Sequence, residues 1–148
     1  MRARPVHFQV ALLIVFAALF FISVQGEAQT KGDKTFNAII TDTQGIETEV
    51  KNVFFYWEEK ISETAFVPHE VRQLPVKRGT ATVQVKFDSM KQIDVKQSAD
   101  KALPTFTVIL ANGKSGDFSA ALAGSFRGES DFGQTEIPIN TISKVVFK

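Results

Sequence analysis

The side chains most suited to catalysis are few in this 148-residue chain, which has two histidines and no cysteine. His69 is the histidine that remains once the N-terminal targeting segment described below is removed, and Ser62, Thr64 and Glu70 are the potential partners nearest to it. None of them belongs to a nucleophile turn such as Gly-x-Ser-x-Gly, and a zinc site normally draws on several histidine or cysteine ligands. The sequence therefore predicts no catalytic triad, no metal site and no cofactor, and it places His69 at the surface beside Pro68.

Glu58 and Glu59 are adjacent carboxylates, the residue type that glycosidases use as an acid and base pair. In an extended chain neighbouring side chains point to opposite faces, so these two cannot work as a pair on one strand. We expect them instead at a solvated hairpin tip over residues 58–64, together with Lys60.

The loop at residues 127–133, with the sequence RGESDFG, has the composition of a binding loop. Glu129 and Asp131 alternate as the ligands of a hard cation do, although an EF-hand needs a longer acidic register with a distal glutamate, which this loop lacks. A β-turn bracketed by glycines is the alternative. We take Arg127, Glu129 and Asp131 as candidate binding residues, without a predicted metal site.

Residues 53–57, VFFYW, form the most apolar stretch after the targeting segment, and their aromatic and β-branched side chains favour a strand. In a strand Phe54 and Tyr56 point to one face and Trp57 points to the other. Because both faces are apolar, we expect both to be covered, and one cover can be a partner. The predicted binding surface therefore comprises Phe54, Tyr56 and Trp57, with Glu58 of the hairpin that follows.

Short strands separated by turns account for most of the remaining chain. Alternation is clearest over residues 80–87, where every second residue from Ala81 to Phe87 is expected to face inward. Asp88 and Ser89 are suited to cap a single helical turn. No long run has the 3.6-residue period of a helix, so the predicted fold class is all-β.

The same pattern occurs twice, in residues 35–76 and 105–147. Each copy opens with a β-rich stretch, reaches a polar turn and closes with an apolar residue, another three positions later and a third two positions after that. Such repeats indicate assembly from related units, so we predict duplicated short-strand units that form either a small barrel pair or a shared β-sandwich. The closing residues are Val71, Leu74 and Val76 in the first copy and Ile142, Val145 and Phe147 in the second, and Met90, Ile93 and Val95 repeat the spacing between them.

Residues 1–28 have the layout of a secretory signal peptide. Arginines precede an apolar run over residues 10–24, and small residues at Gly26 and Ala28 offer two cleavage positions. An uncleaved anchor is the alternative, but the run is shorter than the roughly 20 residues that span a bilayer. We predict export to the periplasm or the cell exterior, and the absence of cysteine excludes a lipid attached to that residue type.

The predicted organisation continues with a polar lead at residues 29–34, a first β unit with an extra hairpin at 35–95, a linker at 96–104 and a second β unit at 105–148. Cleavage removes two basic residues and one acidic residue from the 17 and 16 of the whole chain, which leaves 15 of each. A neutral chain without a basic stripe is not expected to bind nucleic acid. No membrane contact is expected after cleavage, and the remaining length is sufficient for a core without disulfides.

The stretch GQTEIPINTISKVVF, from Gly133 to Phe147, resembles an ending common among small exported bacterial β modules. In those modules a glycine precedes a strand, an Ile-Pro-aliphatic step follows, and apolar residues come at spacings of three and two. The resemblance covers the second unit well and the first loosely, because the proline at Pro68 is displaced by one residue relative to Pro138. It implies a small barrel-like fold in an accessory or binding role and carries over no catalytic residue.

Three hypotheses of function are consistent with these patterns. The first is a non-enzymatic exported module that binds a protein partner, or itself, through the strand at 54–57 and the hairpin at 58–64. The second is a protein that binds a small apolar or sugar ligand in the cleft between the units. The third is a hydrolase that uses His69 or a pair of carboxylates.

Overall fold

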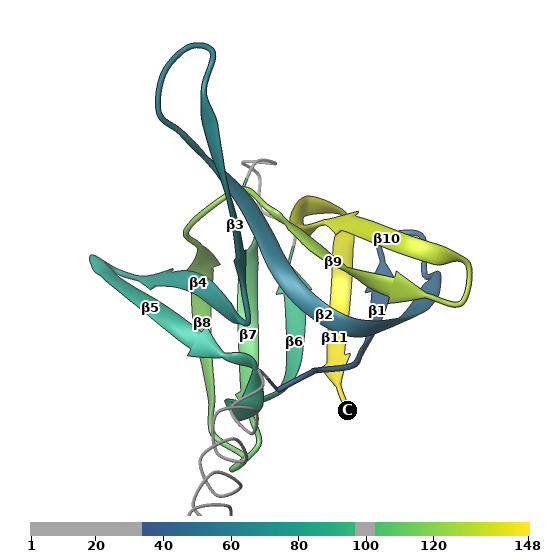
Figure 1. Cartoon of the computed structure of the whole chain (residues 1–148). Coiled ribbons are helices and arrows are strands. Elements are labelled where there is room, and N and C mark those ends of the chain that lie inside the picture. The colour runs from purple at the N-terminus through teal and green to yellow at the C-terminus, as the bar shows by residue number, and fades with distance from the viewer. Residues whose placement is uncertain (1–33, 97–102) are drawn as a thin grey trace, which may run out of the picture. The chain divides into compact units, whose positions relative to one another are not determined.

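A computed structural model describes residues 34–96 and 103–148 (Figure 1). The regular secondary structure of this part consists of strands and two short 3-10 turns. The predicted all-β class is confirmed. The predicted signal peptide, nearly all of the polar lead and most of the linker lie outside the described residues. No described helix has the length and apolar character that a membrane crossing requires. The elements are β1 (Ala38–Asp42), β2 (Glu47–Lys60), β3 (Phe66–Val71), β4 (Gln73–Arg78), β5 (Ala81–Lys86), η2 (Phe87–Ser89), β6 (Met90–Lys96), β7 (Thr105–Leu110), β8 (Ser115–Ala120), β9 (Ser125–Ser130), β10 (Gly133–Pro138), η3 (Ile139–Thr141) and β11 (Ile142–Phe147).

The strands pair antiparallel along one continuous path, in the order β10-β9-β2-β1-β11-β6-β7-β8-β4-β5, and β3 pairs with β2 beside that path. The path has two ends, at β10 and β5, so the sheet is not closed into a barrel. The predicted barrel pair is therefore wrong. Of the alternative, a shared β-sandwich, the structure supports the sharing, because Thr35–Lys148 forms one compact unit around a single hydrophobic core cluster and its strands follow one continuous path.

The strand order is symmetric about the central pair β11–β6. At equal distances from this pair lie β1 and β7, β2 and β8, β9 and β4, and β10 and β5. Each of these pairs takes one strand from each predicted β unit. The two stretches of chain therefore interleave their strands instead of forming two separate sheets.

The 3-10 turns η2 and η3 precede β6 and β11, the two central strands. Each turn starts at a buried residue, Phe87 or Ile139, and the strand after it buries apolar residues at the same spacing. The predicted helical turn before Met90 is thus confirmed, although no side chain caps it. The closing residues that start at Ile142 correspond in the structure to those that start at Met90, because both sets lie within one strand that follows a 3-10 turn. The predicted correspondence with the set that starts at Val71 is wrong, because Val71 ends β3 and Leu74 lies in β4. The duplication itself stays a prediction.

The core is built mainly from aromatic and β-branched side chains. Phe55, Phe87 and Phe106 are its largest fully buried side chains. The ring of Phe126 lies 5.6 Å from that of Phe55 and 6.1 Å from that of Phe87, between ring centres. Phe126 of β9 therefore joins β2 to the turn that leads into the central strand β6.

A bulge divides β2, the longest of the described strands. The register with β9 shifts between Lys51 and Phe54, and Asn52 has a left-handed φ of 51°. Opposite the bulge, a Cβ atom on Gly128 would come within 2.5 Å of Val50 Cγ1 and 2.7 Å of Lys51 O. Only glycine fits at that position, and the bulge redirects β2 so that its first part pairs with β1 and its last part with β3.

The β5 strand is less buried than its alternating sequence predicts. Val85 and the following Phe87 are buried, but Ala81 and Val83 are exposed. The reason is that β4 pairs with β8 at two positions only, so the tip of the β4–β5 hairpin leaves the core. The inward orientation predicted for this strand is therefore right for its second half alone.

Beyond its last pairing with β9, at Tyr56, β2 continues and forms with β3 a hairpin that projects from the rest of the sheet (Figure 1). We call residues 57–69 of this hairpin the arm. Its tip lies at residues 61–65, later than the predicted tip at 58–64, because β2 keeps pairing with β3 as far as Lys60. Among the described residues, no hairpin like the arm lies beside β8, the strand that matches β2 in the symmetric order.

Pro68 lies within the arm on β3, opposite Glu58. At the tip the Ile61 N–H donates to the Ala65 carbonyl at 3.0 Å, and hydrogen-bonded pairs alternate with non-bonded pairs along an antiparallel ladder. The pair of Ile61 and Ala65 is hydrogen-bonded, so the pair of Glu58 and Pro68, three steps further along the ladder, is non-bonded, and the nitrogen of Pro68 faces away from β2. The outer edge of β3 therefore lacks one N–H donor, as expected for a proline in an edge strand.

Candidate functional site

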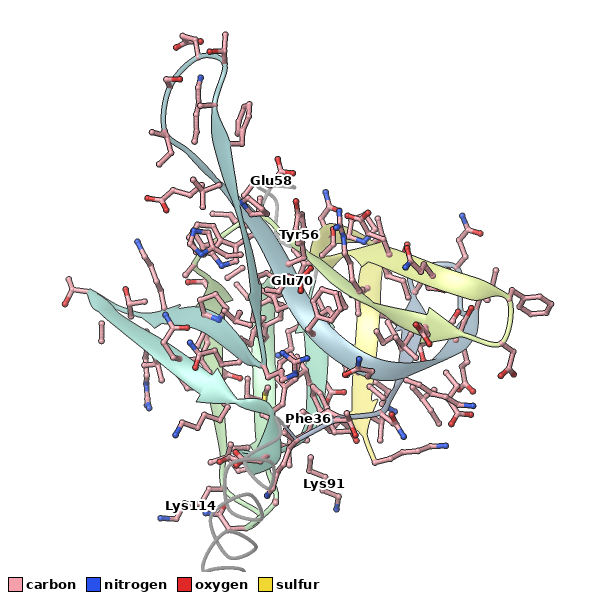
Figure 2. All side chains as sticks on the ribbon, viewed as in Figure 1. Phe36, Tyr56, Glu58, Glu70, Lys91 and Lys114 are labelled. Carbon is pink, nitrogen blue, oxygen red and sulfur yellow. The ribbon has the colours of Figure 1, made fainter. Side chains whose placement is uncertain are left out.

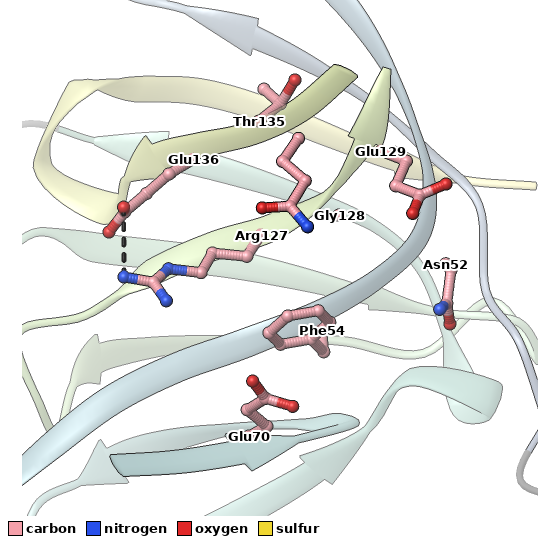
Figure 3. Close-up of a pocket in the computed structure, with 9 residues that line it drawn as sticks. Asn52, Phe54, Glu70, Arg127, Gly128, Glu129, Thr135 and Glu136 are labelled. Carbon is pink, nitrogen blue, oxygen red and sulfur yellow. Dashed lines mark ion pairs between the residues drawn. The ribbon is translucent and has the colours of Figure 1, made fainter. Parts of the chain in front are cut away.

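A pocket of about 460 Å³ opens where β2, β9 and β10 run side by side (Figure 3). Phe54 lies between Arg127 and Glu70 in this pocket (Figure 3). The pocket takes residues from both predicted β units, so it occupies a seam between them, as the second hypothesis requires. Its lining residues are Asn52, Phe54, Glu70, Arg127, Gly128, Glu129, Gln134, Thr135 and Glu136.

Arg127 is held in the pocket by two contacts. Its Nη2 atom lies 3.2 Å from Glu136 Oε2, and its guanidinium carbon lies 3.5 Å from the centre of the Tyr56 ring. The strand register explains both contacts. Arg127 pairs with Glu136 of β10 on one side and with Phe54 of β2 on the other, and Tyr56 follows two residues after Phe54 on the same face of β2. The Nε atom of Arg127 is buried and has no hydrogen-bond partner among the described residues. An acceptor that reached this atom would remove the cost of a buried unpaired donor.

The Tyr56 hydroxyl donates a hydrogen bond of 2.6 Å to Glu58 Oε1. This hydrogen bond raises the pKa of Tyr56 above its ordinary value, and desolvation and the Glu58 charge act in the same direction, while Arg127 opposes them. Loss of the phenol proton would remove the hydrogen bond and bring two negative groups together. Glu58, Tyr56, Arg127 and Glu136 therefore form a row of contacts from the base of the arm to β10, and Figure 2 labels Glu58 and Tyr56 at its start.

The carboxylates of the pocket outnumber its cation. Glu70 and Glu129 form no ion pair with any described residue. Together with Glu136 they oppose the single guanidinium of Arg127, which gives the lining three negative groups, one positive group and a formal charge of −2. The Phe54 ring adds an apolar face. Such a pocket suits a ligand that offers hydrogen-bond donors or positive charge beside a flat apolar group.

Trp57 lies on the opposite face of β2 from Phe54 and Tyr56 and is not part of the pocket. The alternation of side chains predicted for this strand is confirmed. The expectation that both faces of the strand are covered is wrong, because Phe54 and Tyr56 on one face are only half-buried. The Trp57 ring stacks on its cross-strand partner His69 at 4.2 Å between ring centres, and His69 Nε2 lies 3.0 Å from Glu59 Oε2. His69 is therefore half-buried and paired, not a free surface histidine.

The predicted separation of Glu58 and Glu59 is confirmed, because one contacts Tyr56 and the other contacts His69 on the opposite face. The contacts of His69 are with Glu59 and Trp57 and include no serine or threonine hydroxyl, so within the described residues the triad arrangement that the third hypothesis needs is not formed.

The acidic residues of the 127–133 loop also lie in different surroundings. Glu129 lines the pocket, whereas Asp131 follows β9 and lies 3.9 Å from Lys51 Nζ. Within residues 34–96 and 103–148, no three histidine, aspartate or glutamate side chains converge in a way that could hold a metal ion. The predicted loop is therefore wrong for most of its length, because residues 127–130 belong to β9 and Gly133 begins β10, which leaves only Asp131 and Phe132 in the turn between them.

The arm carries apolar side chains that no described residue covers. Ile61 is 60% exposed, Phe66 53% and Val67 41%. Ile61 and Val67 point to one face of the hairpin and Phe66 points to the other, because paired residues of a ladder share a face. Sequence reasoning missed Phe66 and Val67 as surface residues, although an apolar pair just before Pro68 in an edge position was a usable signal.

Several pocket residues also escaped sequence reasoning. They come from strands that lie far apart in the sequence, and only the register of β2, β9 and β10 brings them together. Asn52 has a left-handed backbone conformation, and the sequence offers no signal for it except that asparagine tolerates this conformation better than most residues. These residues are Asn52, Glu70, Gly128, Gln134, Thr135 and Glu136.

Comparison with models of protein families finds a match. A family model described as "Uncharacterised protein" matches residues 32–148. The chain belongs to this family. The match covers every described strand and excludes the predicted signal peptide. No curated protein matches the chain.

Proposed function

We propose that this protein is a non-enzymatic binding module that contacts a protein partner through the arm. The exposure of Ile61, Phe66 and Val67 on an ordered hairpin carries this proposal. Apolar side chains gathered on a projecting element are typical of an interaction site, because burial against a partner removes them from water.

The base of the arm is braced by side-chain contacts across its two strands. Trp57 stacks on His69, and His69 also contacts Glu59. The arm therefore presents its tip in a defined orientation, which reduces the conformational entropy that a partner must remove on binding. Because Pro68 interrupts the donors on the outer edge of β3, recognition by side chains is favoured over addition of a further strand there.

The experiment is photo-crosslinking from the tip of the arm in cells that produce the protein. A photoreactive phenylalanine analogue replaces Phe66 in one variant and Phe132, which is fully exposed in the β9–β10 turn, in a matched control. We expect a protein adduct from position 66 and none from position 132, with mass spectrometry identifying the attached chain. Equal labelling at the two positions, or none at either, would refute the arm as the contact surface.

The pocket supports a second candidate function, the binding of a sugar-like ligand. The observation that favours it is the Phe54 ring surrounded by unpaired carboxylates and amides, a combination that stacks against a sugar ring and accepts hydrogen bonds from its hydroxyls. Titration calorimetry with a set of oligosaccharides tests this function. Binding should be lost in Phe54→Ala and retained in Phe118→Ala, and the absence of heat with every sugar would exclude it for that set.

We also propose that the protein is exported with loss of its N-terminal segment, on the basis of the apolar run at residues 10–24. Mass spectrometry of the protein recovered from producing cells should find a chain that starts at Glu27 or Gln29. A chain that starts at Met1 would contradict cleavage and favour the uncleaved anchor.

A further inference from the structure

A second hollow, of about 430 Å³, lies between the β4–β5 hairpin and the β7–β8 hairpin. It opens because β4 pairs with β8 only at Val76 and Lys77, and the hairpin then diverges from β8 (Figure 1). We call this hollow the basic groove. Its lining includes the cations Arg78, Lys86 and Lys114 and the apolar residues Val83, Val85, Leu110 and Phe118.

The two walls of the basic groove are apolar. Val83 and Val85 of β5 form one wall, and Leu110 and Phe118 come from the opposite hairpin. Val83 is exposed and Phe118 is only half-buried. An apolar wedge placed between these walls would therefore remove hydrophobic surface from water on both of its sides.

Positive charge surrounds these walls. Arg78, Lys86 and Lys114 line the basic groove, and none of them forms an ion pair with a described residue. No aspartate or glutamate occurs among the described lining residues, so three cations and no carboxylate give a formal charge of +3. The groove therefore selects an apolar occupant that carries negative charge.

The arm has the complementary properties. Its side chains include Glu58, Glu59 and Glu63 against the single cation Lys60, which gives a formal charge of −2 with His69 neutral. Its exposed apolar side chains point to both faces of the hairpin, as a wedge between two apolar walls requires. The arm and the basic groove thus match in charge and in the placement of apolar groups.

The arm of a molecule is not seated in its own groove, because its tip is exposed. Figure 2 shows Lys114 at the end of the β unit away from Glu58, which lies at the base of the arm. Because the tip of the arm is exposed and not seated in the groove of the same molecule, a second molecule is needed to join the two complementary surfaces.

We propose that the arm of one molecule seats in the basic groove of a second copy, so that the protein associates head to tail. This inference rests on the proposed function of the arm and names its partner. Because the two contacting surfaces differ, each bound pair keeps one free arm and one free groove, and association continues until a ring closes or a filament forms.

The test uses light scattering coupled to size-exclusion chromatography on the purified protein and on two half-defective variants. Ile61→Ser/Phe66→Ser disables the arm, and Lys86→Glu/Lys114→Glu disables the groove. Each variant alone should associate at least about tenfold more weakly than the wild type, the loss typical of a central anchor. Mixed together, they should form a one-to-one dimer, because the first contributes an intact groove and the second an intact arm.

Lys91→Glu/Lys144→Glu is the matched control, because it makes the same change of charge at two exposed lysines outside the groove. It should associate like the wild type, and circular dichroism should show β structure in every variant. A wild-type protein that stays monomeric at its highest soluble concentration, or a mixture that forms no dimer, would overturn the self-docking.

These outcomes are distinguishable from failure of the proposed function. A monomeric protein whose position-66 probe still crosslinks to a different protein would overturn the self-docking and leave the arm as a contact surface. An adduct of twice the mass of the chain supports both proposals. The absence of any adduct from position 66 refutes the proposed function and the self-docking with it.

Discussion

The β2–β9–β10 region and the β8–β4–β5 region occupy matching places in the symmetric strand order, yet they present opposite charges. In both, an arginine lies over an aromatic ring. Arg127 lies 3.5 Å from the Tyr56 ring centre, whereas Arg78 lies 5.9 Å from that of Phe118. The first arginine is also fixed by Glu136, and the second forms no ion pair with any described residue.

The extent of strand pairing accounts for this difference. β9 pairs with β2 over the stretch from Lys51 to Tyr56, and Gly124 and Gly128 let its backbone lie against that strand. β4 pairs with β8 at two positions and then diverges. A hairpin that stays paired with its neighbour fixes its side chains in a pocket, and one that diverges leaves a groove with unpaired cations. Four predictions test this contrast, from the largest expected effect to the smallest.

The close approach of β9 to β2 should depend on Gly128. Gly128→Ala should lower the free energy of unfolding by about 3 kcal/mol, because the new Cβ atom would overlap Val50 and the Lys51 carbonyl. Gly116→Ala in β8 is the matched change, where the Cβ atom would meet only the edge of the half-buried Phe118 ring, at 3.1 Å, and should cost less than about 1 kcal/mol. Urea unfolding followed by circular dichroism measures both. Equal losses would show that the two regions are packed alike.

The bulge that shapes the pocket should depend on the left-handed backbone at residue 52. Asn52→Val should cost about 1 to 2 kcal/mol, because a β-branched side chain is strained at a φ of 51°. Asn52→Gly should be close to neutral, since glycine adopts that conformation freely. Chemical denaturation compares the two variants. An unchanged free energy of unfolding in Asn52→Val would mean that the bulge relaxes to another conformation.

The two arginines should differ in their contribution to stability. Arg127→Met should cost about 1 kcal/mol, because its contacts with Tyr56 and Glu136 are lost while its partly buried hydrocarbon stem is replaced. The gain from removing the unpaired Nε donor keeps this cost small. Arg78→Met should stay within about 0.5 kcal/mol of the wild type. A larger loss of stability in Arg78→Met than in Arg127→Met would contradict the conclusion that Arg127 is the more firmly held of the two arginines.

The smallest effect concerns the phenol of Tyr56, the one tyrosine of the chain. Its ultraviolet titration should have a midpoint above the ordinary value of about 10. Because the folded-state pKa is raised, the associated stability is present below the unfolded pKa and is lost as the pH rises through the folded pKa. Glu58→Gln should lower the midpoint, and Glu70→Gln should leave it unchanged because Glu70 is not among the causes of the shift.

Local pattern predicted part of this fold because local rules decide it. The two-residue period separated Phe54 and Tyr56 from Trp57. Asp88 and Ser89 predicted the turn into β6, although neither side chain caps it. Neither the open sheet nor the pocket followed from sequence, because both depend on which strands become neighbours. Glu136 meets Arg127 only through a cross-strand register that no local signal sets. The tip of the arm was predicted too early in the sequence, because charged residues such as Glu58 suggested a turn, whereas in the structure they continue β2.

The position of β11 in the sheet has a consequence for how the protein can be made. β11 follows the ten other strands along the chain, yet it lies at the centre of the sheet, between β1 and β6. Until it emerges from the ribosome, β1 and β6 have no strand to join them, and the two sides of the core remain separate. The sheet can therefore be completed only after β11, the last of the described strands, has been added to the chain.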